Sequence, residues 1–201
     1  MTLRRAVDNL VRLGVLERRS TSGTHVAAPN VVRPLDGRHA YSMSQIVQSS
    51  GGAPGSRLLF FEAAVASPKL AENLGVAPGA PLIAVRRLRT SNGVPFCVET
   101  SYLPAERVPG LAAADLVENA SLYGILKERF GIQVGDRQGV ISVAPVGAQD
   151  AALLGLEPDA SVLLYRCIVF DRHGKPIEHM ISVNHPQRVM FQTSADLLSL
   201  E

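Results

Sequence analysis

The chain has 201 residues, of which 46% are hydrophobic and 19% charged, and its formal net charge is +2. This composition predicts a folded protein with an apolar core and excludes a wholly disordered chain. No apolar run reaches the roughly 18 residues of a membrane span, and the N-terminus lacks a secretory signal pattern. The two cysteines, Cys97 and Cys167, lie apart in apolar segments, so we expect a cytoplasmic protein with reduced cysteines and no metal site.

The N-terminal segment predicts one helix followed by a hairpin. In residues 1–13, apolar side chains recur three and four positions apart, which is typical of an amphipathic helix. Gly14 is a helix stop, and a basic two-stranded hairpin with its turn at residues 20–23 follows. Residues 1–26 carry a formal charge of +3, whereas the rest of the chain carries −1. This uneven charge fits contact with a phosphate backbone at this end alone.

The helix and hairpin resemble the recognition helix and wing of the winged helix-turn-helix in the GntR family of bacterial transcription regulators. The residues that match the family pattern are Thr2, Arg4, Arg5, Ala6, Leu10, Gly14, Leu16, Arg18, Gly23, Thr24 and Val26. The resemblance implies contacts with double-stranded operator DNA by Thr2, Arg4, Arg5, Gly23 and Thr24. It also implies two further helices ahead of this one, so we expect the chain to begin inside a truncated winged helix.

Proline, asparagine and glycine are frequent in residues 27–37, which is typical of a linker. We therefore expect a partial DNA-binding domain over residues 1–28, a linker over 29–36 and a second domain over 37–201. Hydrophobic periodicity and turn residues predict the elements of the second domain. The predicted helices are 41–49, 68–74, 122–130 and 148–154, the predicted strands are 57–66, 81–90, 94–103, 133–144, 162–171, 176–184 and 189–193, and a Gly-rich loop spans 51–56.

An internal repeat indicates how these elements are arranged. The segment Leu74–Ala80 aligns with Leu154–Ala160, and both contain a Leu-Gly helix stop and a proline turn. In both copies a glycine turn then joins two long strands. Two copies of helix plus hairpin predict an α+β fold with one antiparallel sheet, approximate twofold symmetry, helices on one face and a binding cleft between the halves.

The second domain also resembles the UTRA effector-binding domain of the HutC branch of GntR regulators. The resemblance lies in Arg87-Leu88-Arg89, Gly93-Val94-Pro95, Glu99–Pro104, Ser121-Leu122-Tyr123 and Pro176-Ile177-Glu178. It implies a chorismate-lyase-like fold.

Strand periodicity indicates a candidate ligand site. Arg87 and Arg89 lie two positions apart and therefore share one face of their strand, as Glu99 and Ser101 do on the returning strand. Two neighbouring arginines on an apolar strand are costly to bury unless an anion meets them. Alternatively, one arginine forms a surface ion pair with Glu99 across the hairpin. Glu178, in the second repeat, is either part of the same cleft or a solvated strand residue.

The resemblance assigns roles to these residues. It implies that Arg87 and Arg89 hold the anionic group of a phosphorylated sugar or another small anion. Ser121 and Tyr123, at the start of a helix, would assist because free N–H groups favour anions there. Glu99 and Glu178 would accept hydrogen bonds from the ligand, and Ser56 in the Gly-rich loop would add a backbone donor.

The sequence therefore predicts a ligand-responsive repressor that acts as a homodimer on palindromic DNA, without a cofactor and away from the membrane. Two alternatives remain open. One is a lyase-like enzyme, because the fold is shared with a pyruvate-eliminating lyase, although no pairing of nucleophile and base is present. The other is a stand-alone effector module that does not bind DNA.

Overall fold

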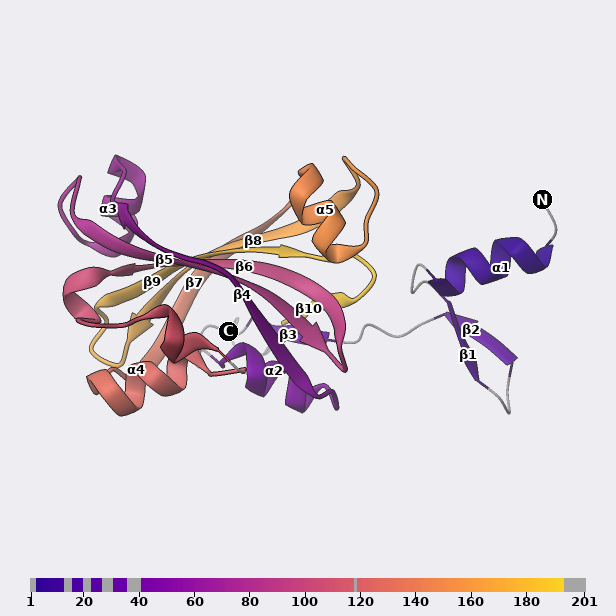
Figure 1. Cartoon of the computed structure of the whole chain (residues 1–201), viewed down its shortest axis with the longest axis horizontal. Helices are drawn as coiled ribbons and strands as arrows, with labels where there is room; N and C mark the ends of the chain where they lie inside the picture. Colours follow the sequence, from indigo (N-terminus) through magenta and orange to yellow (C-terminus); the bar gives the residue numbers. More distant parts are fainter. Residues whose placement is uncertain are drawn as a thin grey trace, which may run out of the picture.

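The computed structural model describes residues 3–12, 16–19, 23–26, 31–35, 41–117 and 119–193. These residues form an α+β fold built around a six-stranded antiparallel sheet with strand order β4-β5-β6-β9-β8-β7 (Figure 1). The elements are α1 (Leu3–Arg12), β1 (Leu16–Arg19), β2 (Gly23–Val26), β3 (Val31–Pro34), α2 (Met43–Ser49), β4 (Pro54–Val65), α3 (Pro68–Leu74), β5 (Pro81–Ser91), β6 (Val94–Pro104), α4 (Leu122–Phe130), β7 (Val134–Pro145), α5 (Ala148–Leu154), β8 (Ser161–Asp171), β9 (Pro176–Asn184) and β10 (Val189–Gln192), with short 3-10 segments at Ala105–Arg107 and Ala113–Leu116.

The predicted repeat is confirmed as two strand–helix–hairpin halves. The first half is β4-α3-β5-β6 and the second is β7-α5-β8-β9, and β6 pairs with β9 at the centre of the sheet. Helices α3 and α5 both end at a glycine in the left-handed region, Gly75 with φ 63° and Gly155 with φ 71°. A left-handed helix end favours glycine because it has no Cβ to clash.

The sequence predicted that the helices lie on one face of the sheet. They lie on both faces (Figure 1). Helices α3 and α5 cover one face, where Leu74 packs against Leu82 and Leu154 packs against Leu88. Helices α2 and α4 and the small β3–β10 sheet lie on the other face. The prediction was wrong because the repeat contains only α3 and α5, whereas α2 and α4 lie outside it.

Part of the predicted linker is a buried strand. Residues 31–34 form β3, which pairs in parallel with β10 from Val31↔Val189 to Pro34↔Gln192. Val31 is completely buried and Arg33 is 1% exposed. Local composition could not predict this, because the partner strand lies more than 150 residues further along the chain. The other residues of the predicted linker, apart from Leu35, lie outside the described residues.

The N-terminal elements match the prediction of a helix followed by a hairpin. Helix α1 is followed by β1 and β2, which pair antiparallel. Asp8 of α1 forms an ion pair with Arg18 of β1, and Gly23 has a φ of 91°, as a tight turn requires. Thr2 and Gly14 lie outside the described residues. None of the described helices has the length and apolar composition needed to cross a membrane.

Candidate functional site

A small polar cavity lies between the central sheet and the elements that cover it. Its walls come from β3, β5, β6, β7, β9, helix α2 with the two residues before it, and the start of α4. The enclosed space is about 20 Å³, which is close to the room that one water molecule needs. A wider groove of about 470 Å³ shares Ser42, Ser44, Ser121 and Tyr123 with it. The cavity is therefore nearly closed and adjoins a groove between α2 and α4.

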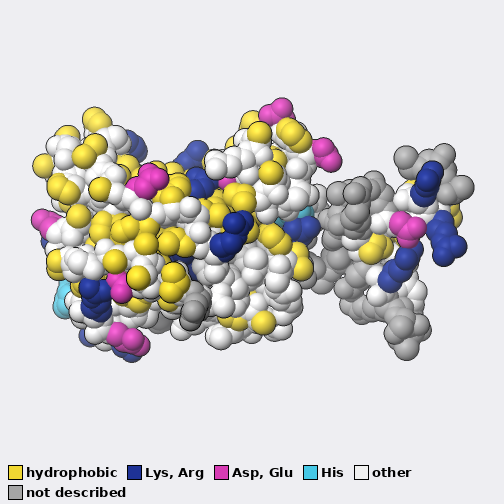
Figure 2. Space-filling model, in the orientation of Figure 1, with side chains coloured by type: hydrophobic (Ala, Val, Ile, Leu, Met, Phe, Trp, Pro, Cys, Tyr) yellow, Lys and Arg dark blue, Asp and Glu magenta, His cyan; other side chains and the backbone are white. Residues whose placement is uncertain are grey.

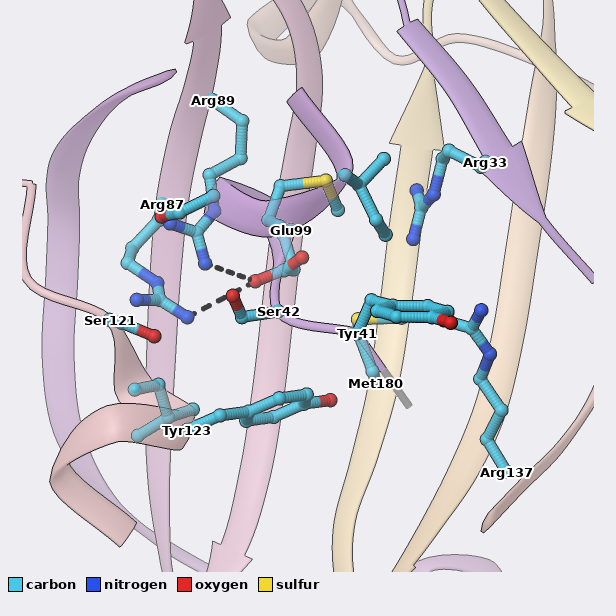
Figure 3. A pocket seen from close by; sticks show the side chains of 14 residues that line it. Arg33, Tyr41, Ser42, Arg87, Arg89, Glu99, Ser121, Tyr123, Arg137 and Met180 are labelled. Atoms are coloured by element: carbon cyan, nitrogen blue, oxygen red, sulfur yellow. Dashed lines mark hydrogen bonds and ion pairs between the residues drawn. The ribbon is translucent and has the colours of Figure 1, made fainter. Parts of the chain in front are cut away.

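A buried cluster of Arg87, Arg89 and Glu99 forms one side of the cavity (Figure 3). Arg87 lies directly opposite Glu99 in the register of β5 and β6, and Arg89 lies two residues along on the same face. Both guanidinium groups donate to the same oxygen, Glu99 Oε1, with Nη2 distances of 3.1 Å for Arg87 and 2.7 Å for Arg89. The three side chains are at most 6% exposed. The surface ion pair that the sequence left open is therefore a buried cluster.

The cluster carries more positive than negative charge. Burial by itself raises the pKa of Glu99. The adjacent Arg89 and Arg87 have the larger combined effect and lower this pKa to about 2. Burial and the neighbouring Arg89 lower the pKa of Arg87 to about 10, so Arg87 and Glu99 are both charged at pH 7. Arg87 Nη1 and Arg89 Nε have no hydrogen-bond partner among the described residues. Two buried cations with spare donors and a single carboxylate suit an additional anion.

The start of α4 forms the neighbouring wall and contains two of the predicted residues. Ser121 is the N-cap of α4, and its hydroxyl accepts a hydrogen bond from Gly124 N at 3.3 Å. Tyr123 donates its hydroxyl proton to Glu178 Oε2 at 2.8 Å. Glu178 is 1% exposed and does not line the cavity, and burial together with Glu99 raises its pKa. It therefore orients Tyr123, and the solvated alternative for Glu178 is excluded.

Two predicted residues are placed differently from the prediction. Ser56 belongs to strand β4 rather than to a loop, and its backbone N–H already donates to Asn119 Oδ1 at 2.6 Å. The predicted backbone donor is therefore occupied, whereas the Ser56 hydroxyl accepts from Arg89 Nη1 at 3.1 Å. Ser101 is completely buried in β6 and is not part of the cavity wall. Ser56 therefore contacts Arg89, and neither Ser56 nor Ser101 lines the cavity.

Sequence reasoning missed two arginines of the cavity wall, Arg33 and Arg137. Arg33 of β3 donates through Nη1 to Ser182 Oγ and Asn184 Oδ1, both at 2.6 Å. Arg137 of β7 donates through Nη2 to the backbone oxygen of Pro34 at 2.6 Å. The two adjacent β-branched residues Val31 and Val32 were the available signal for a strand, but the surrounding prolines hid it.

Comparisons with known proteins identify the family. The UTRA domain model matches residues 49–189. The HTH-type transcriptional repressor PhnF of Mycolicibacterium smegmatis is 33% identical over 190 residues, which cover 94% of this chain and 75% of that protein. The chain is a GntR-family transcriptional regulator with a UTRA domain.

Two further similarities support this assignment. The HTH-type transcriptional repressor NagR of Bacillus subtilis is 29% identical to this regulator over 202 residues, or 99% of this chain and 80% of the relative. A crystal structure of PhnF from Mycobacterium smegmatis superposes with a TM-score of 0.76 at 32% identity, and covers 95% of this chain and 82% of the other. These relatives are transcriptional regulators, so the enzyme alternative is set aside.

Proposed function

We propose that this regulator is a cytoplasmic repressor that binds operator DNA through its N-terminal helix and hairpin and responds to a small anionic metabolite held in the cavity. The excess of buried positive charge at Arg87 and Arg89 carries the proposal of an anionic effector. The start of α4 adds a helix N-terminus, whose partial positive charge also favours an anion. A sugar phosphate combines the anion with hydroxyls that Ser42, Ser121 and Tyr123 can meet.

Effector binding requires the cavity to widen. Small-molecule sites commonly measure about 300–1,000 Å³, whereas the enclosed space here is about 20 Å³. The adjoining groove of about 470 Å³ lies along α2 and α4 and offers a route of entry. Because α2 follows β3 and the N-terminal elements in the chain, its displacement would connect effector binding to the DNA-binding end.

The anion site is tested by comparing neighbouring arginines on opposite faces of β5. Arg89→Ala removes a charge-assisted contact, which is typically worth about 1.5–3 kcal/mol, so we expect sugar-phosphate affinity to fall about tenfold to a hundredfold. Arg86→Ala is the matched control, because Arg86 pairs with Asp150 on the other face of the sheet. A thermal-shift screen of sugar phosphates, carboxylates and neutral sugars selects the ligand. Calorimetric titration then measures its affinity for both variants. If only neutral sugars bind and Arg89→Ala binds them equally well, the anion site is refuted.

The DNA-binding role rests on the arrangement of α1 and the hairpin. Arg4 and Arg5 are exposed at the start of α1, and Gly23 and Thr24 are exposed at the hairpin turn. In a winged helix these positions meet base edges and the phosphate backbone. In a protein that carries the whole winged helix, Arg4→Ala with Arg5→Ala should weaken operator binding about tenfold or more at constant salt. Equal mobility-shift titrations for parent and variant would refute this role.

We also infer that the regulator is a homodimer. Strands β4 and β7 are the edges of the sheet, and Val65, Val140 and Val143 on them are 65–70% exposed. Apolar edge strands invite pairing or coverage, and a twofold dimer suits a palindromic operator. In Figure 2 apolar side chains gather over the front of the sheet domain. Light scattering should give twice the chain mass of 21.5 kDa, and the single-chain mass at micromolar concentration would refute the dimer.

A further inference from the structure

The two arginines that sequence reasoning missed lie away from the Arg87–Arg89–Glu99 cluster. In the view of Figure 3 that cluster occupies one side of the cavity, and Arg33 and Arg137 occupy the other. All four arginines line the same enclosed space. Arg33 and Arg137 come from β3 and β7, which are far from β5 in the sequence and are not its neighbours in the sheet. The cavity therefore has two separate cationic ends.

Glu99 attracts Arg33 at longer range, but no carboxylate of the described residues contacts the second end. Among the described residues, neither Arg33 nor Arg137 forms an ion pair, although Arg33 is 1% exposed and Arg137 is 7% exposed. The partners of Arg33 are the neutral Ser182 and Asn184, and its guanidinium lies over the rings of Tyr165 and Phe191 at 5.3 and 5.2 Å. Burying an unpaired cation is costly, and neutral partners offset only part of that cost.

Both side chains also keep unused donors. Arg33 Nε and Arg137 Nε are buried and have no hydrogen-bond partner among the described residues. Buried guanidinium donors are normally satisfied, and a carboxylate or phosphate group is the acceptor that best fits their geometry. Pro34 O receives a hydrogen bond from Arg137 and belongs to the strand that carries Arg33, so the two arginines are held near each other.

We propose that Arg33 and Arg137 form a second anion subsite, so that the effector carries two separated anionic groups, one for each end of the cavity. This inference rests on the proposed function, because it assumes that Arg87 and Arg89 bind the first group. The effector class is a small hydroxylated metabolite with a phosphate at one end and a carboxylate or second phosphate at the other. Compounds with only one anionic group leave one end without a partner and bind more weakly.

The test uses pairs of compounds that differ by one anionic group. Sorbitol 6-phosphate is compared with 6-phosphogluconate, and glycerol 3-phosphate with 3-phosphoglycerate, by calorimetric titration of the whole chain. We expect the two-anion member of at least one pair to bind about tenfold or more tightly. Arg137→Gln should remove this preference and change the affinity for the one-anion member by less than about threefold. Arg137→Lys, which retains the charge, should restore part of the preference.

The variants separate this inference from the proposed function and from a purely structural role. Arg89→Gln should weaken both members of a pair. Equal affinity of the paired compounds for the parent protein, with loss of both in Arg89→Gln, would overturn the second subsite and leave the proposed function standing. Failure of every anionic compound to bind would overturn both. If Arg137→Gln lowers the melting temperature without ligand but keeps the preference, Arg137 is structural and the subsite is overturned.

Discussion

The two halves of the sheet share one backbone plan but differ in what they bury. Arg87 and Glu99 face each other across β5 and β6 in the first half. At the corresponding register position of the second half, Cys167 faces Met180 across β8 and β9. All four side chains are buried. The same position in the fold therefore holds an ion pair in one half and an apolar pair in the other.

This difference separates the signals for the fold from those for the site. The Leu-Gly helix ends and the glycine turns occur in both halves and specify the backbone. Arg87, Arg89 and Glu99 stand where the second half has Cys167, Val169 and Met180. A buried apolar pair stabilises the sheet at no electrostatic cost, whereas a buried ion cluster with excess charge is costly unless a further anion balances it. Departures from an internal repeat are therefore a guide to function.

The largest expected effect comes from removing the charge that balances the two arginines. Glu99→Gln preserves the shape of the side chain but leaves Arg87 and Arg89 buried without their ion-pair partner. Breaking a buried pair in this way costs roughly 3–5 kcal/mol of unfolding free energy. Met180→Leu, at the matching position of the second half, should cost less than about 1.5 kcal/mol. Urea unfolding monitored by circular dichroism measures both.

Added anion sharpens this comparison. Inorganic phosphate that occupies the cluster would replace part of the lost negative charge, so it should stabilise Glu99→Gln more than it stabilises Met180→Leu. A Glu99→Gln protein within about 1 kcal/mol of the parent would show that the arginines do not depend on Glu99.

The sequence predicted local and repeated features better than distant contacts. Strand periodicity placed Arg87 and Arg89 on one face, and Ser121 lies at the start of a helix, as predicted. The parallel pairing of β3 with β10 was not predictable, because a local sequence pattern does not indicate which distant strand a segment pairs with. Arg33 was missed for that reason. The closure of the cavity also depends on how α2 and α4 pack on the sheet, which hydrophobic periodicity does not describe.

The second effect concerns the ends of β6 and β9, where Pro104 in the first half corresponds to His185 in the second. His185 is buried, and its Nδ1 accepts a hydrogen bond from Gln187 N at 3.2 Å. Burial, with a smaller contribution from Arg188, lowers the pKa of His185 to about 4. The unfolded chain has the ordinary value of about 6.5, so it binds the proton more readily and stability is lost as pH falls from about 6.5 to 4.

His185 should therefore contribute about 2 kcal/mol to the loss of unfolding free energy between pH 7 and pH 5. His185→Asn keeps an acceptor for the Gln187 N–H and removes the titration, so its stability should fall less steeply over this range. Denaturant unfolding of parent and variant at both pH values measures the difference. An equally steep fall in the variant would assign the acid sensitivity to other groups.

The smallest effect compares two arginines at equivalent positions on the outer face of the sheet, Arg86 and Arg166. Arg86 Nη2 donates to Asp150 Oδ1 of α5 at 2.5 Å, and so joins a strand of the first half to a helix of the second. The residue that corresponds to Asp150 in the first half is Leu70, so Arg166 has no equivalent acid to meet. Arg166 Nη1 instead donates a 3.5 Å hydrogen bond to Ser142 Oγ, and the Arg166 side chain is exposed.

We expect Arg86→Ala to cost about 1 kcal/mol of unfolding free energy, because the Arg86–Asp150 pair is partly buried and well aligned. Arg166→Ala should stay within about 0.5 kcal/mol of the parent, as exposed substitutions usually do. A double-mutant cycle of Arg86→Ala with Asp150→Ala isolates the contribution of the pair. If the two arginine variants prove equally stable, the contact between the halves adds nothing at this position. The two halves would then differ in function only inside the cavity, where we propose that the arginines meet the effector.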